Sequence, residues 1–198
     1  MATTNVTCNS FKDELITGIH YVAKAWAAST AYVVGDRRTN DSGKVYECIT
    51  AGTSAGSGGP TGTTSDITDN TAHWKYLWAQ DVFKVALYNS SATLSKSTTA
   101  YSSTNEISGT GYSAGGGTLT GINVNLAGAN SDVASIDWAD YVFSNSTLTS
   151  VTQALIYNSS KQNRAVCVVT WDSPGKSTNA GDFTVQLPSS GTGVIRIS

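Results

Sequence analysis

The stretch WAASTAYVVGDRRTNDSGKVYECITAG (residues 26–52) gathers aromatic residues around a Gly-Asp turn. Two short apolar runs in it, AYVV and KVYECIT, are separated by the turn-rich segment GDRRTNDSG. Short runs rich in Val, Ile, Thr and Tyr, bounded by Gly, Asn, Asp and Ser, are typical of β-strands. The stretch therefore predicts a small β-module, and its aromatic residues are either the core of that module or a ligand-binding surface.

The same texture continues to about residue 80. HWKYLW (residues 73–78) is expected to be another strand, and the Gly-, Ser- and Thr-rich segment 52–70 before it is expected to be an exposed loop. The end of that segment, DITDN (residues 66–70), offers carboxylates that Ca²⁺ could use, but it lacks the EF-hand spacing, which favours an ordinary turn.

An amphipathic helix is predicted over residues 9–22, ahead of the module. Ser10 suits the N-cap position, and Asp13 and Glu14 suit the first turn. The apolar residues at helical spacing are Phe11, Leu15, Ile19 and Val22. A helix this short needs a docking surface, because it is marginally stable alone in water.

From Asp81 onward the pattern indicates a larger β-domain. DVFKVALYNSS begins with a strand, and further strands are predicted at 136–144, 148–157 and 164–171 and in the segments AGDFTVQLP and GVIRIS. We expect a mainly β fold, an antiparallel sandwich or barrel-like sheet with one N-terminal helix. We therefore divide the chain into a β-domain of residues 1–22 and 81–198, on which the helix docks, and an inserted module of residues 23–80.

Composition excludes several functional classes. Charged residues make up 13% of the chain, the net charge is −2, and Arg37–Arg38 is the largest basic cluster, so we expect no nucleic-acid partner. No apolar run approaches the length of a membrane span, and the N-terminus lacks the pattern of a signal peptide, so we expect folding in the cytoplasm of the cell that makes it. Cys8, Cys48 and Cys167 are expected to be reduced, buried thiols without a metal.

A catalytic constellation does not stand out. His20 and His73 lie beside no nucleophile motif, and the Gly-rich segment 109–117 lacks the Lys-Ser/Thr and the helix of a phosphate-binding loop, so it is read as a turn. Carboxylates for glycoside hydrolysis could be Glu47, Glu106, Asp137, Asp140, Asp172 or Asp182. Nothing singles out two of them, so we expect no enzyme, no catalytic residue and no cofactor.

The module resembles the small chitin- and cellulose-type carbohydrate-binding modules that accompany bacterial chitinases. The matching residues are Trp26, Tyr32, Gly35, Asp36, Gly43, Lys44, Tyr46 and Trp74. In those modules the strand after the Tyr leads into exposed aromatic residues on which sugars stack, whereas here Cys48, Ile49 and Thr50 follow.

A module of this size needs its large residues for a core. We therefore assign Trp26, Tyr32, Tyr46 and Trp74 to the core. The candidate contacts for a glycan or a protein partner are Tyr76, Trp78, Ile49 and Thr50, together with the 53–65 loop.

The rest of the chain, NSFKDELITGIH followed by FKVALYNSSATLSKSTTAYSSTNEISGTGYSAGGGTLTG and ALIYNSSKQNRAVCVVTWD, is similar to small phage and prophage virion proteins. In that group the helix runs almost directly into the Phe-Lys-x-Ala-Leu-Tyr strand, which supports an insertion here. The resemblance implies a virion component from the head or the head–tail region, and no chemistry.

Three functions follow as hypotheses. The leading one is a capsid decoration (cement) protein on the virion surface, whose partners are the major capsid protein and other copies of itself, plausibly as a trimer. The alternative is a tail-associated adsorption protein that binds host glycans through residues 24–80. The third, a glycan hydrolase, has no visible acid, base or nucleophile to support it.

Overall fold

The computed structural model describes residues 3–16, 18–127, 133–171, 175–188 and 193–197. The chain divides into two compact units, one formed by residues 1–20 and 82–198 and the other by residues 21–81. These boundaries lie within about two residues of those expected from the sequence, an offset no larger than the usual uncertainty of element ends. Below, they are called the β-domain and the module.

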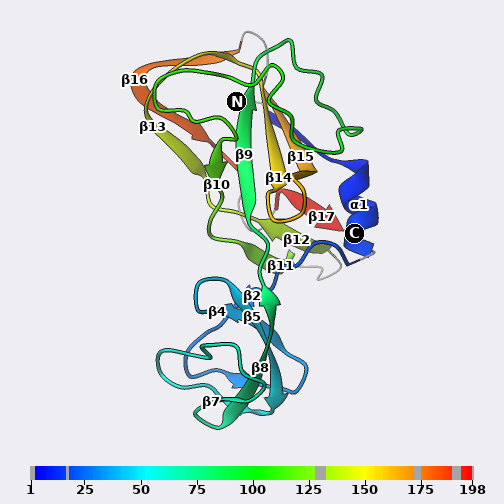
Figure 1. Cartoon of the computed structure of the whole chain (residues 1–198), viewed down its shortest axis with the longest axis vertical. Coiled ribbons are helices and arrows are strands. Elements are labelled where there is room, and N and C mark those ends of the chain that lie inside the picture. The colour runs from blue at the N-terminus through cyan, green and yellow to red at the C-terminus, as the bar shows by residue number, and fades with distance from the viewer. Residues whose placement is uncertain (1–2, 17, 128–132, 172–174, 189–192, 198) are drawn as a thin grey trace. The chain divides into compact units, whose positions relative to one another are not determined.

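The main sheet of the β-domain has five antiparallel strands in the order β1-β15-β14-β9-β10 (Figure 1). Their bounds are β1 Thr3–Thr7, β9 Phe83–Tyr88, β10 Gly117–Thr118, β14 Gln153–Asn158 and β15 Arg164–Trp171. β9 and β14 are central and read as nearly continuous apolar runs, since Val85, Leu87, Leu155 and Ile156 are fully buried. This sheet carries the core of the β-domain.

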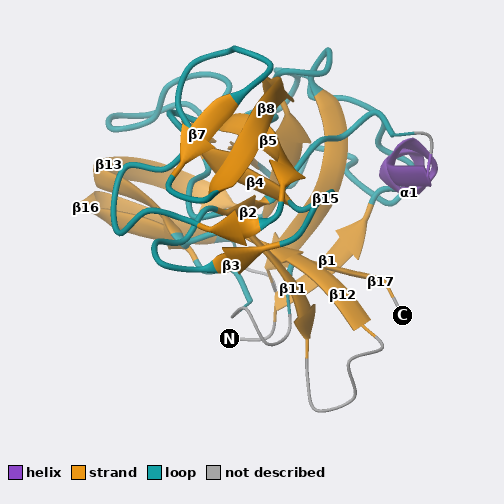
Figure 2. Ribbon diagram, turned by 90° about the horizontal axis from the view of Figure 1, so that it is seen from below, coloured by secondary structure: helices purple, strands orange, loops and turns teal. Residues whose placement is uncertain are grey.

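Two smaller sheets complete the β-domain. β11 (Asn123–Ala127), β12 (Val133–Asp137) and β17 (Ile195–Ile197) form one of them, and β13 (Tyr141–Val151) pairs with β16 (Lys176–Val185) in a long ribbon (Figure 2). The fold is mainly β, with antiparallel pairing and a sandwich-like set of sheets. Among the described residues these sheets do not close into a barrel, so the sandwich part of the expected fold class is the one that applies.

The helix is shorter than predicted. α1 spans Asn9–Ile16, not 9–22, and belongs to the β-domain, where Phe11 is buried and the helix packs against β15. It ends in a Schellman motif, in which Ile19 N–H donates to the carbonyl of Glu14 and Gly18 N–H donates to that of Leu15. Gly18 has φ of +72°, a left-handed conformation that stops a helix. Ser10 lies inside the first turn, so it is not the N-cap.

Two strand predictions in the β-domain need correction. The predicted strand 136–144 covers the end of β12, a break and the start of β13. The predicted strand 148–157 covers the end of β13, a break at Thr152 and nearly all of β14. The residues between it and the strand predicted at 136–144 lie inside β13, where the pairing with β16 shifts register and Asn145 has φ of +49°. By contrast, β15 begins and ends where the sequence predicts.

The module consists of two sheets. The larger has the order β2-β4-β5-β8-β7, with β2 and β4 parallel and the other pairs antiparallel, and the smaller pairs β3 with β6 (Figure 2). The bounds are β2 Lys24–Ala25, β3 Ala31–Tyr32, β4 Arg37–Asn40, β5 Lys44–Thr50, β6 Gly52–Thr53, β7 Ile67–Asp69 and β8 Ala72–Ala79. β4 lies in the segment that the sequence presents as a turn.

The long loop of the module is bonded to the body of the module along its length. Asn40 donates through Nδ2 to the carbonyls of Gly58 and Pro60, and Tyr46 donates its hydroxyl to the carbonyl of Gly62. Pro60 is itself buried. The segment 52–70, expected to be one exposed loop, includes β6 and β7, and residues 54–66 between these strands therefore follow a fixed path without a helix or strand.

Candidate functional site

Three of the four aromatic residues assigned to the module core face inward. Tyr32, Tyr46 and Trp74 are at most 2% exposed and form the module core with Cys48 and Ala72. The rings of Tyr32 and Trp74 meet edge to face, with centroids 4.9 Å apart. Of the four residues assigned to the core, Trp26 alone remains half-buried, and it packs against this cluster from outside.

Asp69 holds the tryptophans of the core in place. Its Oδ2 accepts hydrogen bonds from the indole N–H of Trp26 at 2.8 Å and of Trp74 at 3.1 Å, and its Oδ1 accepts from the backbone N–H of Ala55 at 2.9 Å. The carboxylate is 3% exposed. A buried charge is tolerated when its oxygens are satisfied by hydrogen bonds. Asp69, the second Asp of the DITDN segment, therefore has a structural role.

The candidate contact residues do not form one surface. Val45 lies opposite Trp78 and Tyr46 lies opposite Tyr76, so β8 carries one extra residue at Leu77. This bulge turns Tyr76 toward the core, where its ring meets that of Tyr46 at 6.1 Å, and turns Trp78 to the opposite face. Thr50 is exposed at the far end of β5, opposite His73, and Ile49 beside it is half-buried.

Trp78 instead belongs to a different group, which we call the Trp78 face: Tyr21, Arg37, Glu47, Lys75 and Trp78. The Tyr21 ring lies 4.7 Å from that of Trp78, and the Arg37 guanidinium lies 5.3 Å from the Trp78 ring centroid. Glu47 pairs with Lys75 at 2.7 Å and with Arg37 at 3.0 Å. These two partners, Lys75 first, hold the pKa of the Glu47 carboxyl below its usual value. The face offers an aromatic edge beside charged hydrogen-bonding groups.

Glu106, one of the carboxylates considered for catalysis, anchors a turn in the β-domain. It accepts hydrogen bonds from the Tyr101 hydroxyl at 2.7 Å, from the Tyr112 hydroxyl at 2.6 Å and from the Gly115 N–H at 2.7 Å. Burial, and then the bond to Glu106, raise the pKa of both tyrosines well above the usual value. The carboxylate fixes the Gly-rich segment 109–117 to the domain.

The remaining carboxylates are in varied surroundings. Asp137 is 6% exposed, and burial, followed by the nearby charge of Asp140, raises its pKa. Its Oδ1 has no hydrogen-bond partner among the described residues. Asp140 accepts from the Leu187 N–H and Asp182 from the Asn145 N–H. Asp172 lies outside the described residues. Asp140 and Asp182 therefore each satisfy a backbone N–H from a distant part of the chain.

A buried polar network around His20 was not predicted, because its members come from distant parts of the chain. His20 Nε2 lies 2.7 Å from Glu14 Oε2, and Arg164 contacts the other oxygen of Glu14. Asn158 Oδ1 accepts from the Ser160 N–H, so the amide points its Nδ2 toward His20 Nδ1, 2.8 Å away. His20 Nδ1 is therefore the acceptor, and its Nε2–H donates to Glu14.

Comparison with protein-family models, with curated proteins and with solved structures finds no match. Within the described part of the chain, no three His, Cys, Asp or Glu side chains gather closely enough to hold a metal ion. The three cysteines are free and buried, as the sequence predicts. No helix among the described residues is long and apolar enough to span a membrane.

Proposed function

We propose that the chain is a non-enzymatic structural protein of a bacteriophage virion, which decorates the capsid as a cement protein. The observation that supports this proposal best is the way in which the chain leaves and re-enters the β-domain around residues 21–81. It fits a phage virion domain that has received an extra module.

On the module side, the two ends of the insertion lie next to each other. The Tyr21 N–H donates to Asp81 Oδ2 at 2.9 Å, and the Asp81 N–H donates to the Tyr21 carbonyl at 3.2 Å. Adjacent ends are what a tolerated domain insertion requires, because the host then closes the same short connection with or without it.

On the β-domain side, one hairpin loop holds both flanking residues. This loop joins β14 to β15. His20 bonds to Asn158, the last residue of β14, while the Val82 N–H donates to Ser160 Oγ in the loop and the Val82 carbonyl accepts from the Ser159 N–H. The helix segment therefore meets the FKVALY strand at one place, which is the arrangement expected if the two were directly connected before the insertion.

The surface chemistry agrees with a capsid role. The chain is poor in charge and rich in hydroxyl side chains and β-strands, so its contacts with neighbours would rest on shape and on backbone hydrogen bonds more than on ion pairing. The proposed partners are the major capsid protein and other copies of this chain, in a homo-oligomer such as a trimer.

The test is to locate the protein in purified particles of the phage that encodes it. Mass spectrometry of separated heads and tails is expected to find the chain with heads, and cryo-electron microscopy is expected to show it at symmetric positions on the outer capsid surface. Recovery with tails alone, or absence from particles, would contradict the proposal.

A second candidate, an adsorption protein that binds host glycans through residues 24–80, is favoured by one observation. The Trp78 face places an aromatic edge beside a guanidinium and an ammonium group, the types of group that contact sugars. Retention of the full chain on polymeric chitin or cellulose, lost on substitution of Arg37 and Lys75 by Ala, would support this function. No retention on either polymer would count against it.

A further inference from the structure

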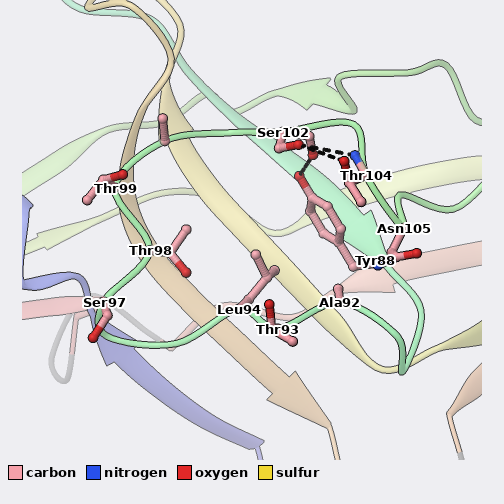
Figure 3. A pocket seen from close by; sticks show the side chains of 11 residues that line it. Tyr88, Ala92, Thr93, Leu94, Ser97, Thr98, Thr99, Ser102, Thr104 and Asn105 are labelled. Carbon is pink, nitrogen blue, oxygen red and sulfur yellow. Dashed lines mark hydrogen bonds between the residues drawn. The ribbon is translucent and has the colours of Figure 1, made fainter.

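The β-domain contains a hollow that none of the functions above uses. The segment after β9, residues 89–105, forms an open ring around it (Figure 3). The cavity has a volume of about 320 Å³, at the lower end of the range in which proteins bind small molecules. Its wall is made by Tyr88, Ala92, Thr93, Leu94, Ser97, Thr98, Thr99, Ala100, Ser102, Thr104 and Asn105. We call it the loop hollow.

The ring is fixed at several points although it has almost no regular secondary structure. Its ends are joined by the Asn89 N–H, which donates to the Asn105 carbonyl. Its middle is held by the Asn9 N–H, which donates to the Lys96 carbonyl, and by the Ala165 N–H, which donates to that of Thr99. Long ordered loops of this kind are uncommon and often functional. A ligand entering the hollow would find its contacts already in place.

The chemistry of the wall is uncharged. It contains no Asp, Glu, Lys, Arg or His, and the Tyr88 hydroxyl is engaged because it donates to the Ser102 carbonyl at 2.7 Å. Thr93, Ser97 and Thr99 make no side-chain hydrogen bond to any residue that the structure describes, but the Ser97 and Thr99 side chains lie on the outer side of the ring (Figure 3). The Thr98 side chain points into the ring, and because its Oγ1 accepts from the Ser95 N–H, its O–H remains able to donate. Thr93 and Thr98 are therefore the hydroxyls that a ligand in the hollow would meet. Leu94 and the two alanines supply apolar patches between them.

From these properties we propose that the loop hollow is a binding site for a neutral sugar unit. A pyranose ring is uncharged, carries hydroxyls that both donate and accept, and has apolar C–H faces, which matches hydroxyls alternating with Leu94 and alanines. The ring of Tyr88 is buried, so it offers no stacking platform. Affinity therefore rests on hydroxyl contacts that replace bound water, and a dissociation constant of about 1 mM or weaker is expected.

The test is an NMR titration of the full chain, ¹⁵N-labelled, with glucose, galactose and N-acetylglucosamine up to tens of millimolar. At least one sugar is expected to give saturable shift changes that centre on the amides of residues 92–105. Thr93→Val removes an unengaged hydroxyl, and Thr98→Val removes the inward-pointing hydroxyl together with its bond from the Ser95 N–H. Each is expected to weaken binding about fivefold, the scale of one lost hydrogen bond.

Thr149→Val is the matched control, because Thr149 is an exposed threonine of β13 outside the wall. It is expected to leave the titration unchanged. The proposal is overturned if none of the three sugars gives saturable shifts, or if both wall variants bind as the unsubstituted chain does. Shifts confined to residues 21–81 would also overturn it and would favour the glycan-binding alternative instead.

Discussion

Trp26 and Trp74 donate their indole N–H groups to the same carboxylate oxygen, Oδ2 of Asp69, at 2.8 and 3.1 Å. One residue thus ties the outer tryptophan of the module to the central one. Because the acceptor is charged and buried, each bond is of the stronger kind.

Substitution of Asp69 is expected to destabilise the module in graded steps. Asp69→Ala removes the acceptor for three donors, and we expect a loss of about 3 kcal/mol, measured by chemical denaturation with tryptophan fluorescence. Asp69→Asn can still accept from both indoles but presents its NH₂ to the Ala55 N–H, so about 1–2 kcal/mol is expected. Asp66→Asn is the control, since Asp66 is two-thirds exposed and its pair with His73 contributes little. Equal losses for Asp66 and Asp69 would refute this role.

Glu106 is expected to anchor the Gly-rich turn. Glu106→Gln replaces the charged acceptor of three donors by a neutral amide, so each bond that it keeps is weaker, and its NH₂ must face one of the former donors. We expect a loss of about 2 kcal/mol in the stability of the β-domain and faster hydrogen exchange at Gly115. Tyr101→Phe and Tyr112→Phe each remove one bond and should cost about 1 kcal/mol. Unchanged exchange at Gly115 in the Gln variant would show that the turn is held by other contacts.

Asp137 is expected to make stability fall as pH rises. Burial raises its pKa in the folded chain above the ordinary 3.8, so the folded state holds this proton more tightly than the unfolded state does. The penalty is absent below 3.8 and grows as pH rises through the folded-state pKa. Asp137→Asn should therefore be the more stable form at pH 7, with the advantage vanishing in acid. Denaturant midpoints measured across pH for both forms check this, and a less stable Asn variant at pH 7 would contradict it.

The module is expected to be separable from the β-domain. A chain in which residues 21–81 are replaced by a short Gly-Ser link should still fold, because the hairpin after β14 holds both His20 and Val82. Residues 21–81 expressed alone should also fold, since their ends pair with each other. Dispersed amide spectra that overlay on those of the full chain would confirm both, whereas a collapsed spectrum for either piece would show mutual dependence.

The sequence predicted elements whose apolar pattern is local and regular. β15 has the bounds that the sequence predicts because RAVCVVTW is a nearly continuous apolar run next to a polar turn. The helix end was misjudged because Ile19 and Val22 continue the helical spacing past Gly18, and the spacing does not show that Gly18 is left-handed. β1 was missed because TTNVT has a single apolar residue, and its pairing with β15 spans most of the chain.

The candidate site also depends on structural features that a local sequence pattern does not reveal. Tyr76 and Trp78 are two apart in a strand, so the sequence places them on one face, but a single inserted residue at Leu77 separates them. A bulge depends on the register of the neighbouring strand and leaves no mark in its own sequence. Asp69 likewise shows only as a turn residue, because its partners Trp26 and Ala55 are brought to it by the folded loop.

The hairpin that holds His20 and Val82 also bears on engineering. Loop-closure entropy rises slowly with length, and it matters little when the two ends already lie side by side. The junction between residues 20 and 82 is thus a natural point for grafting: a foreign epitope or enzyme with adjacent termini could replace residues 21–81. On a particle carrying many copies of this chain, such a graft would become a multivalent display.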